Sequence, residues 1–170
     1  MLRTLPALLL AGAFVSSASA ADHTIQDQVV QRLNSIEEKL VQLAEAMPQE
    51  KMSWRPMEGV RSPSEVFMHV AAANYFIAGA LGAETPSDVN PREFEKSVTD
   101  KADVAAKLKD SFAFARKAVE EADPEEATKL FGQESTKQGA MLVLVEHASE
   151  HLGQSIAYAR MNEVVPPWSN

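Results

Sequence analysis

Two histidines stand four residues apart near the C-terminus, in the segment EHASEHLGQ, and they are the strongest chemical signal in the sequence. On a helix this spacing places the imidazoles of His147 and His151 on one face, about one turn apart. His69, in the helical pattern SPSEVFMHVAAANYF, offers a third imidazole. Three neutral imidazoles from two packed helices can hold a divalent metal ion and leave coordination positions open for water or substrate, as catalytic sites do. The sequence therefore predicts a metal site made by His69, His147 and His151.

Side chains on the same flank as the histidine pair are candidates to surround this site. His147 and His151 lie roughly 100° from the centre of the apolar stripe of their helix, and His69 lies roughly 70° from the centre of its own stripe. Such positions face the rim of a bundle interior, where a cleft between helices can stay wet. Gln154 and Tyr158 share the flank of the pair, so we expect them either to hydrogen-bond around the metal or to serve as ordinary packing residues. The catalytic residues stay unidentified, because no obvious general base accompanies the three histidines.

Other interpretations of these histidines remain open. A single histidine on an apolar helix is more often a hydrogen-bonded interior residue than a ligand, and a histidine pair on an exposed face can be incidental. The letters HASEH also match the H-x-x-E-H pattern of inverted zinc peptidases. Only nineteen residues follow His151, too few for the distant acidic ligand of such enzymes. A di-iron carboxylate bundle needs glutamate three residues before histidine, and no histidine here has one. We expect Glu150 and His23 to be solvated bystanders.

The first twenty residues have the pattern of a cleaved signal peptide. Arg3 supplies a positive charge, LPALLLAGAFV is an apolar run too short to span a bilayer, and Ala18-Ser19-Ala20 supplies small residues before a cleavage point. A membrane anchor is the alternative, which the short apolar run disfavours. We therefore expect residues 1–20 to be removed and residues 21–170 to form a single domain. The protein is expected to be exported, periplasmic or extracellular, with no membrane contact after cleavage.

Charge and composition narrow the class of partner and the way in which the domain is held together. Loss of the signal segment removes one basic residue, Arg3, and no acidic one, so the net charge moves from −8 to −9. An acidic protein without a basic cluster repels a phosphate backbone, so nucleic acid and anionic membrane surfaces are not expected as partners. The chain has no cysteine, so apolar packing rather than disulfides must hold the fold.

Four helical patterns must position the histidines, and no segment shows a convincing strand pattern. The spacing of apolar residues predicts helices over about 24–47, 62–81, 100–122 and 135–164. A long polar stretch between the second and third helices indicates a crossing over the bundle rather than a tight turn. The predicted fold is all-α, a four-helix bundle with a long connection between helices 2 and 3. The clearest capping signals are Thr24 with Asp27, Ser62 with Glu65, and Ser135 with Gln138.

The order of several short motifs resembles the DinB-like (YfiT-like) superfamily of metalloenzymes. These motifs are the WRP…VRSPSEV lead-in to the helix of His69, the segment HASEHLGQ, and the end YARMNEVVPPWS. The resemblance implies an up-down-down-up bundle and a zinc or nickel ion held by His69, His147 and His151. Characterised relatives include thiol-dependent transferases and isomerases, and relatives often pair into dimers. The resemblance therefore implies such an activity and a possible homodimer. It does not imply DNA binding. One departure is the signal segment, because the thiol cosubstrates of such relatives are cytoplasmic.

The function expected from these observations is that of an exported metal-dependent enzyme, a hydrolase or a thiol-type transferase acting on a small molecule that the sequence does not identify. The metal would acidify a bound water or polarise a substrate oxygen or sulfur. The alternative is a non-catalytic exported bundle that binds metal or a small molecule without converting it. A bundle without metal is the third interpretation; there, histidine substitutions would alter stability but no metal content.

Overall fold

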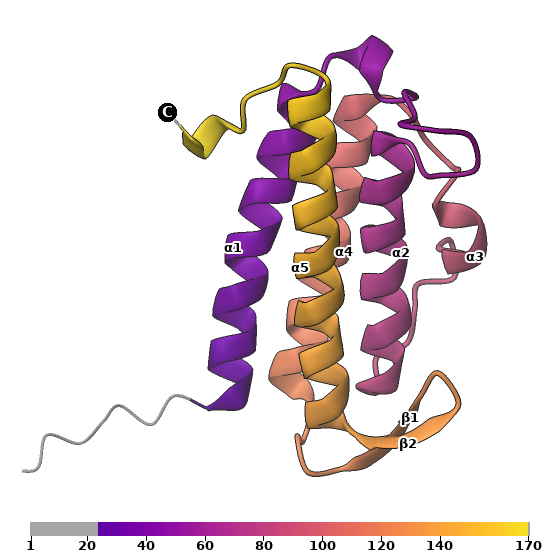
Figure 1. The fold of residues 1–170 in the computed structure, drawn as a ribbon. Helices are drawn as coiled ribbons and strands as arrows, with labels where there is room; N and C mark the ends of the chain where they lie inside the picture. The colour runs from indigo at the N-terminus through magenta and orange to yellow at the C-terminus, as the bar shows by residue number, and fades with distance from the viewer. Residues whose placement is uncertain (1–23, 170) are drawn as a thin grey trace, which may run out of the picture.

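The four long helices of the bundle lie side by side along one axis, two running up and two running down (Figure 1). The structure, a computed structural model, describes residues 24–169; the expected signal segment and His23 lie outside the described residues. The chain runs up in the first long helix, down in the second and third, and up in the fourth, which confirms the expected all-α, up-down-down-up bundle. The long helices are α1 (Ile25–Ala46), α2 (Pro63–Ala80), α4 (Lys101–Glu121) and α5 (Lys137–Met161). Two 3-10 turns, η1 (Gln49–Lys51) and η2 (Pro167–Ser169), flank them.

Local capping signals set the starts of the first three long helices. Thr24 and Asp27 form a capping box at α1, and Ser62 and Glu65 form another at α2. Each box satisfies backbone N–H groups that the first turn of a helix leaves without a partner. Asp100 accepts hydrogen bonds from two backbone N–H groups at the start of α4. These starts agree with the sequence-based prediction.

Helices α1 and α2 each pack against both α4 and α5, so that α1 lies diagonally opposite α2. Apolar side chains from all four helices fill the space between them, as expected for a chain without disulfides. The largest of the fully buried side chains include Leu33, Phe67, Leu108, Phe112 and Leu144. Among the described residues, no helix combines the length and the apolarity that crossing a bilayer requires.

The long connection between α2 and α4 returns along the outer side of α2, as Figure 1 shows. It carries a short helix, α3 (Pro91–Phe94), which the sequence analysis did not predict. Asn90 caps this helix, and the ring of Phe94 is buried against Tyr75 of α2 at a centroid distance of 5.8 Å. One buried aromatic ring therefore anchors the middle of a polar connection to the bundle.

A two-stranded hairpin joins α4 to α5, so the expectation of no strand is wrong. Strand β1 (Ala127–Leu130) pairs antiparallel with β2 (Gln133–Thr136) around a two-residue turn. The expected start of the last helix at Ser135 is also wrong, because Ser135 belongs to β2 and Thr136 caps α5. The helix ends at Met161, three residues before the expected end. Four-residue strands are too short to reveal a period-two pattern, and their pairing is fixed by contacts with the bundle.

Candidate metal centre

The three predicted histidines meet between α2, which carries His69, and α5, which carries His147 and His151. The ring of His69 lies 5.0 Å from that of His147 and 4.8 Å from that of His151, and the latter two rings are 4.5 Å apart. One nitrogen from each ring can be chosen so that all three lie within 4.8 Å of one another. The structure thus brings together all three side chains that the sequence proposed as ligands.

The side of α5 that is buried in the structure lies closer to the histidines than the apolar stripe predicted from the sequence. His151 is only 9% exposed, whereas Val145 and Leu152, which the spacing of apolar residues places on the stripe of this helix, are partly exposed. The prediction that the histidine pair faces the rim of the bundle interior is therefore wrong for His151 and right for His147, which is half-buried. The prediction placed only apolar residues on the buried side of this helix. Polar residues of α5 are also buried, where hydrogen bonds satisfy their side chains. Ser155, for example, is buried and donates its hydroxyl proton to the carbonyl of His151 at 2.8 Å.

A carboxylate behind His69 completes a chain of three side chains. Glu95 Oε2 lies 3.1 Å from Nδ1 of His69, and Arg61 Nε donates to Glu95 Oε1 at 2.9 Å. A carboxylate can only accept, so Nδ1 of His69 carries the proton and its Nε2 is unprotonated. That Nε2 can accept from Nε2 of His147, 3.1 Å away, or bind a metal ion in its place. Metal-binding histidines commonly have such a carboxylate partner, which fixes the tautomer and the ring orientation.

Sequence reasoning missed Glu95, because no local pattern connects it to His69. It lies twenty-six residues further along the chain, directly after α3, in a stretch that contains several other acidic residues. Its position depends on α3, whose Phe94 is buried against α2. The strongest signal in the sequence was a large aromatic residue, Phe94, within a mostly polar connection.

The two other flank residues predicted to surround the site hydrogen-bond in series behind His151. Nδ1 of His151 lies 2.8 Å from Oε1 of Gln154, and Nε2 of Gln154 donates to the hydroxyl of Tyr158 at 3.1 Å. Tyr158 is buried and meets the ring of Trp54 edge-on, with centroids 5.5 Å apart. Since Nδ1 of His151 donates to an amide oxygen, its Nε2 also keeps a free lone pair.

Burial favours the neutral form of His69 and His147. Burial, together with the neighbouring His151, His69 and Arg61, lowers the pKa of His147 to about 4. Burial and the positive charge of Arg61 also lower the pKa of His69, against the opposing effect of Glu95. Burial raises the pKa of Glu95, but the hydrogen bond and charge of Arg61 outweigh it and the pKa is lowered overall. Near neutral pH His69 and His147 are therefore neutral, and the carboxylate of Glu95 behind His69 is ionised.

The arrangement fits a divalent ion. The Nε2 atoms of His69 and His147 face each other at 3.1 Å. Two nitrogens each about 2.0–2.1 Å from one zinc ion are roughly 3.0–3.4 Å apart, depending on the coordination angle. Glu146 and Glu150 are exposed on the outer side of α5, in keeping with the expectation that the glutamate of HASEH is a bystander.

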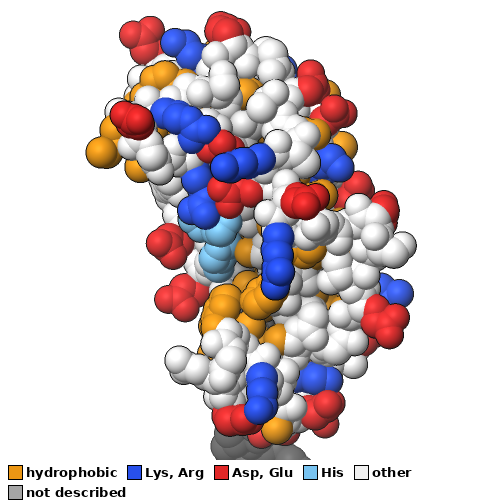
Figure 2. Space-filling view, turned by 90° about the vertical axis from the view of Figure 1, so that its right-hand side faces the viewer, with side chains coloured by type: hydrophobic (Ala, Val, Ile, Leu, Met, Phe, Trp, Pro, Cys, Tyr) orange, Lys and Arg blue, Asp and Glu red, His pale blue; other side chains and the backbone are white. Residues whose placement is uncertain are grey.

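Two cavities of different character adjoin the cluster. One of about 260 Å³ is lined by His69 and His147 together with apolar side chains that include Phe76, Ile77 and Phe131. Another of about 530 Å³ is lined by charged and polar groups that include Arg61, Glu95 and Gln154. Figure 2 shows the histidines at the surface between an orange apolar patch and a group of basic and acidic side chains. The cluster is therefore accessible to small molecules from outside.

The family comparison agrees with this fold and site. The family model described as the DinB superfamily matches residues 32–155, well over half of the chain. The matched region contains the three histidines and Gln154 and ends before Tyr158. No curated protein matches the sequence.

Solved structures share the fold. A DinB-like protein from Bacillus cereus ATCC 10987 superimposes with a TM-score of 0.71 at 17% identity, over 82% of this chain and 93% of that chain. A DinB-like protein from Bacillus subtilis gives 0.64 at 20% identity, over 81% and 93%. A conserved protein from Enterococcus faecalis gives 0.66 at 16% identity, over 81% and 96%. These TM-scores establish a common fold. At identities this low the function must be inferred from the site of this chain.

Proposed function

The chain belongs to the DinB superfamily, and we propose that it is an exported metal-dependent enzyme, a hydrolase or thiol-type transferase that acts on a small molecule. His69, His147 and His151 would hold a divalent ion, zinc or nickel. The observation that carries this proposal is the convergence of three ligand nitrogens within 4.8 Å of one another.

The protein's own residues have separate tasks in this proposal. Glu95 holds the proton of His69 on Nδ1 and turns the Nε2 lone pair toward His147. Gln154 does the same for His151 from the other side. A bound divalent ion would supply Lewis acidity toward a water molecule or toward an oxygen or sulfur atom of the substrate. The two adjoining cavities would bind the rest of the substrate.

Export and the absence of nucleic acid partners are part of the proposal. The apolar run after Arg3 and the small residues before position 21 support cleavage and export. The net charge of −8 opposes binding to phosphate backbones. We also propose a homodimer, which light scattering of the exported protein would test. Cell fractionation with and without residues 1–20 tests the localisation; a protein found only in the cytoplasm would contradict it.

Elemental analysis tests the metal site directly. Protein exported by its own signal should carry close to one equivalent of zinc or nickel, and His69→Ala and His151→Ala should each lose most of it. Glu150→Ala is the matched control, because its side chain belongs to the same helix but is exposed. A parent protein without near-equimolar metal would overturn the proposal.

A non-catalytic metal-binding bundle is the alternative, because no side chain among residues 24–169 is identified as a general base. Ester, amide and thiol-transfer substrates would be offered to the metal-loaded protein. Turnover that disappears in His147→Ala would support the enzyme. Stoichiometric metal with no turnover across all three classes would support the binder.

A further inference from the structure

The apolar cavity beside the histidines has the size and lining of a binding site for a hydrocarbon ring system. It measures about 260 Å³, and Ala72, Ala73, Ile77 and Pro91 contribute to its walls. Apolar cavities of about 150 Å³ in other proteins take up benzene. The cavity beside His69 is therefore large enough for a group bigger than one ring, at a position where His69 and His147 themselves form part of the wall.

Phe131 forms part of this wall from the turn of the hairpin, in a backbone conformation that does not suit its side chain. Phe131 and Gly132 form the two-residue turn between Leu130 and Gln133, with φ angles of +52° and +78°. Turns of this kind favour Asn-Gly, because both residues need positive φ. A bulky aromatic residue there is an uncommon and unfavourable choice. Local turn preference therefore does not account for Phe131.

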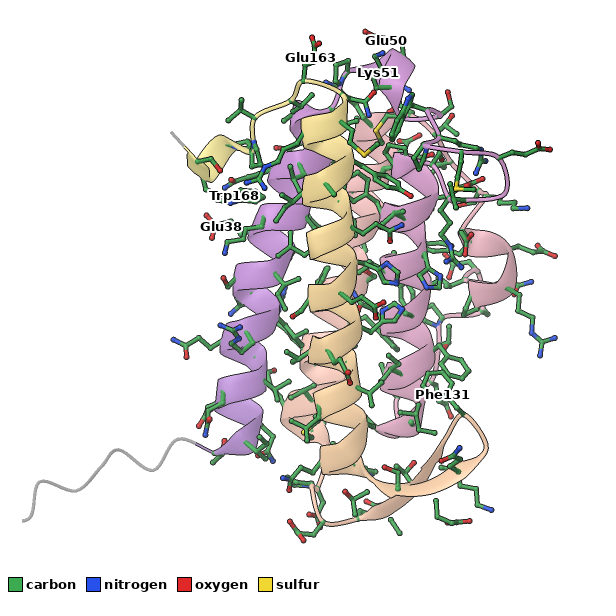
Figure 3. All side chains as sticks on the ribbon, viewed as in Figure 1. Glu38, Glu50, Lys51, Phe131, Glu163 and Trp168 are labelled. Carbon is green, nitrogen blue, oxygen red and sulfur yellow. The ribbon has the colours of Figure 1, made fainter. Side chains whose placement is uncertain are left out.

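Burial does not account for Phe131 either. Phe131 is 66% exposed, and Phe76 of α2 is 51% exposed. Their rings stack, with centroids 5.5 Å apart and planes inclined by 23°. Figure 3 shows Phe131 at the outer tip of the hairpin, beside the lower end of α2. Two large rings that remain half in solvent at the mouth of an apolar cavity offer surface that a bound ligand could cover.

The hairpin is fixed to the bundle firmly enough to define this wall. The hydroxyl of Thr128 donates to the carbonyl of Ala80 at the end of α2, at 2.7 Å. Leu130, next to the turn, is buried in the main apolar core. The ring of Phe131 thus has a defined place relative to α2 and to His69.

A cation lies at the rim of the same cavity. Arg92 lines it from α3 and is exposed, and within residues 24–169 no acidic side chain forms an ion pair with its guanidinium. A planar guanidinium suits a carboxylate, which it can bind through two parallel hydrogen bonds. Figure 2 shows basic side chains bordering the apolar patch next to the histidines.

We propose that the substrate of the histidine site is an aryl carboxylic acid of about two fused rings, whose ring system lies against Phe76 and Phe131 and whose carboxylate pairs with Arg92. Phe131 is a specificity-determining residue in this proposal. That the acid is a substrate rests on the proposed function, since its ring system would hold a reacting group against the metal. Binding of the acid itself needs no metal.

Binding of 2-naphthoate, measured by calorimetry on chelator-treated and on zinc-loaded protein, tests the proposal. The acid should bind both forms. Phe131→Asn should weaken binding on the order of 5- to 10-fold, with a melting temperature that is unchanged or slightly higher, because Asn suits the turn. Leu142→Asn is the matched control, since Leu142 is an exposed apolar residue of α5 outside this cavity, and it should leave binding unchanged.

Arg92→Gln separates the carboxylate from the ring. It should weaken 2-naphthoate binding roughly 2- to 5-fold and leave binding of neutral 2-naphthylmethanol unchanged. Equal naphthoate affinity in the parent protein and in Phe131→Asn, or in the parent protein and in Arg92→Gln, would overturn the proposal. Protein that binds the acid but holds no metal would instead contradict only the proposed function.

Discussion

At the scale of single residues, the position of one proton decides which nitrogen of each histidine can bind a metal. Glu95 and Gln154 accept from the Nδ1 atoms of His69 and His151, and so leave both Nε2 atoms unprotonated. The grouping of the three histidines could be predicted from the sequence because their spacing and helical positions are local properties. Glu95 could not, since only the folded connection brings it to His69.

Replacing Glu95 should weaken metal binding in a graded way. Glu95→Gln keeps a hydrogen-bond acceptor but removes the charge, so the dissociation constant for zinc should rise roughly 10-fold; Glu95→Ala removes both and should approach 100-fold. Competition with a chelator of known zinc affinity measures both values. Glu93→Gln, an exposed neighbour on α3, is the control. Similar affinities for all three variants would show that the carboxylate behind His69 is irrelevant to the ion.

Metal binding should tolerate more acid than a site of ordinary histidines. Protonated imidazole cannot bind a metal, so affinity falls as the pH drops through the pKa of each ligand. An unperturbed histidine begins to lose metal near pH 6.5. His147, with a pKa of about 4, resists protonation until the pH is far lower, and the pKa of His69 is lowered as well.

Dialysis at a series of pH values followed by elemental analysis measures this. The protein should keep its metal at pH 6 and lose it only below about pH 5. A peptide covering residues 143–156 is the comparison, because its two histidines are solvated and should release zinc between about pH 7 and 5.5. Identical release curves for protein and peptide would contradict burial as the cause.

At the scale of elements, the predictions succeeded where local chemistry decides and failed where tertiary contacts decide. The caps at Thr24 and Ser62 are local and were identified correctly, and the third long helix begins where its apolar spacing predicted, after Asp100. The start of α5 was placed at Ser135, because serine followed three residues later by glutamine resembles a capping box. The hairpin takes precedence there, since pairing with Thr128 holds Ser135 in β2.

Substitutions at these two neighbouring positions separate the expected cap from the observed one. The side chain of Thr136 accepts from the backbone N–H of Gly139 at 3.2 Å. Thr136→Ala should therefore lower the free energy of unfolding by about 1 kcal/mol, and Thr136→Gly by less. Ser135→Ala should change it by no more than about 0.5 kcal/mol. Urea denaturation measures all three, and a larger loss in Ser135→Ala would restore the cap that the sequence suggested.

At the scale of the whole molecule, the site joins segments that are far apart in the chain. The facing nitrogens of His69 and His147 belong to residues 78 positions apart, on α2 and α5. Glu95, directly after α3, adds a carboxylate from the long connection, and the hairpin adds an aromatic wall. A metal ion would therefore act as a cross-link between two of the four long helices in a chain without cysteine.

Metal removal should consequently lower the stability of the entire bundle. The unfolded chain offers no preformed three-histidine site, so an ion binds the native state preferentially and stabilises it. At a free zinc concentration 100 times the dissociation constant, the gain is about 2.7 kcal/mol. This corresponds to a rise of roughly 5–10 °C in melting temperature for a chain of this size. Calorimetry of zinc-loaded and chelator-treated protein measures the difference.

In His147→Ala the same treatment should change the melting temperature far less, because only two of the three ligands remain. A reducing agent should have no effect, since there is no disulfide to break. An equal response to chelator in the parent protein and in His147→Ala would mean that the stabilising ion binds elsewhere.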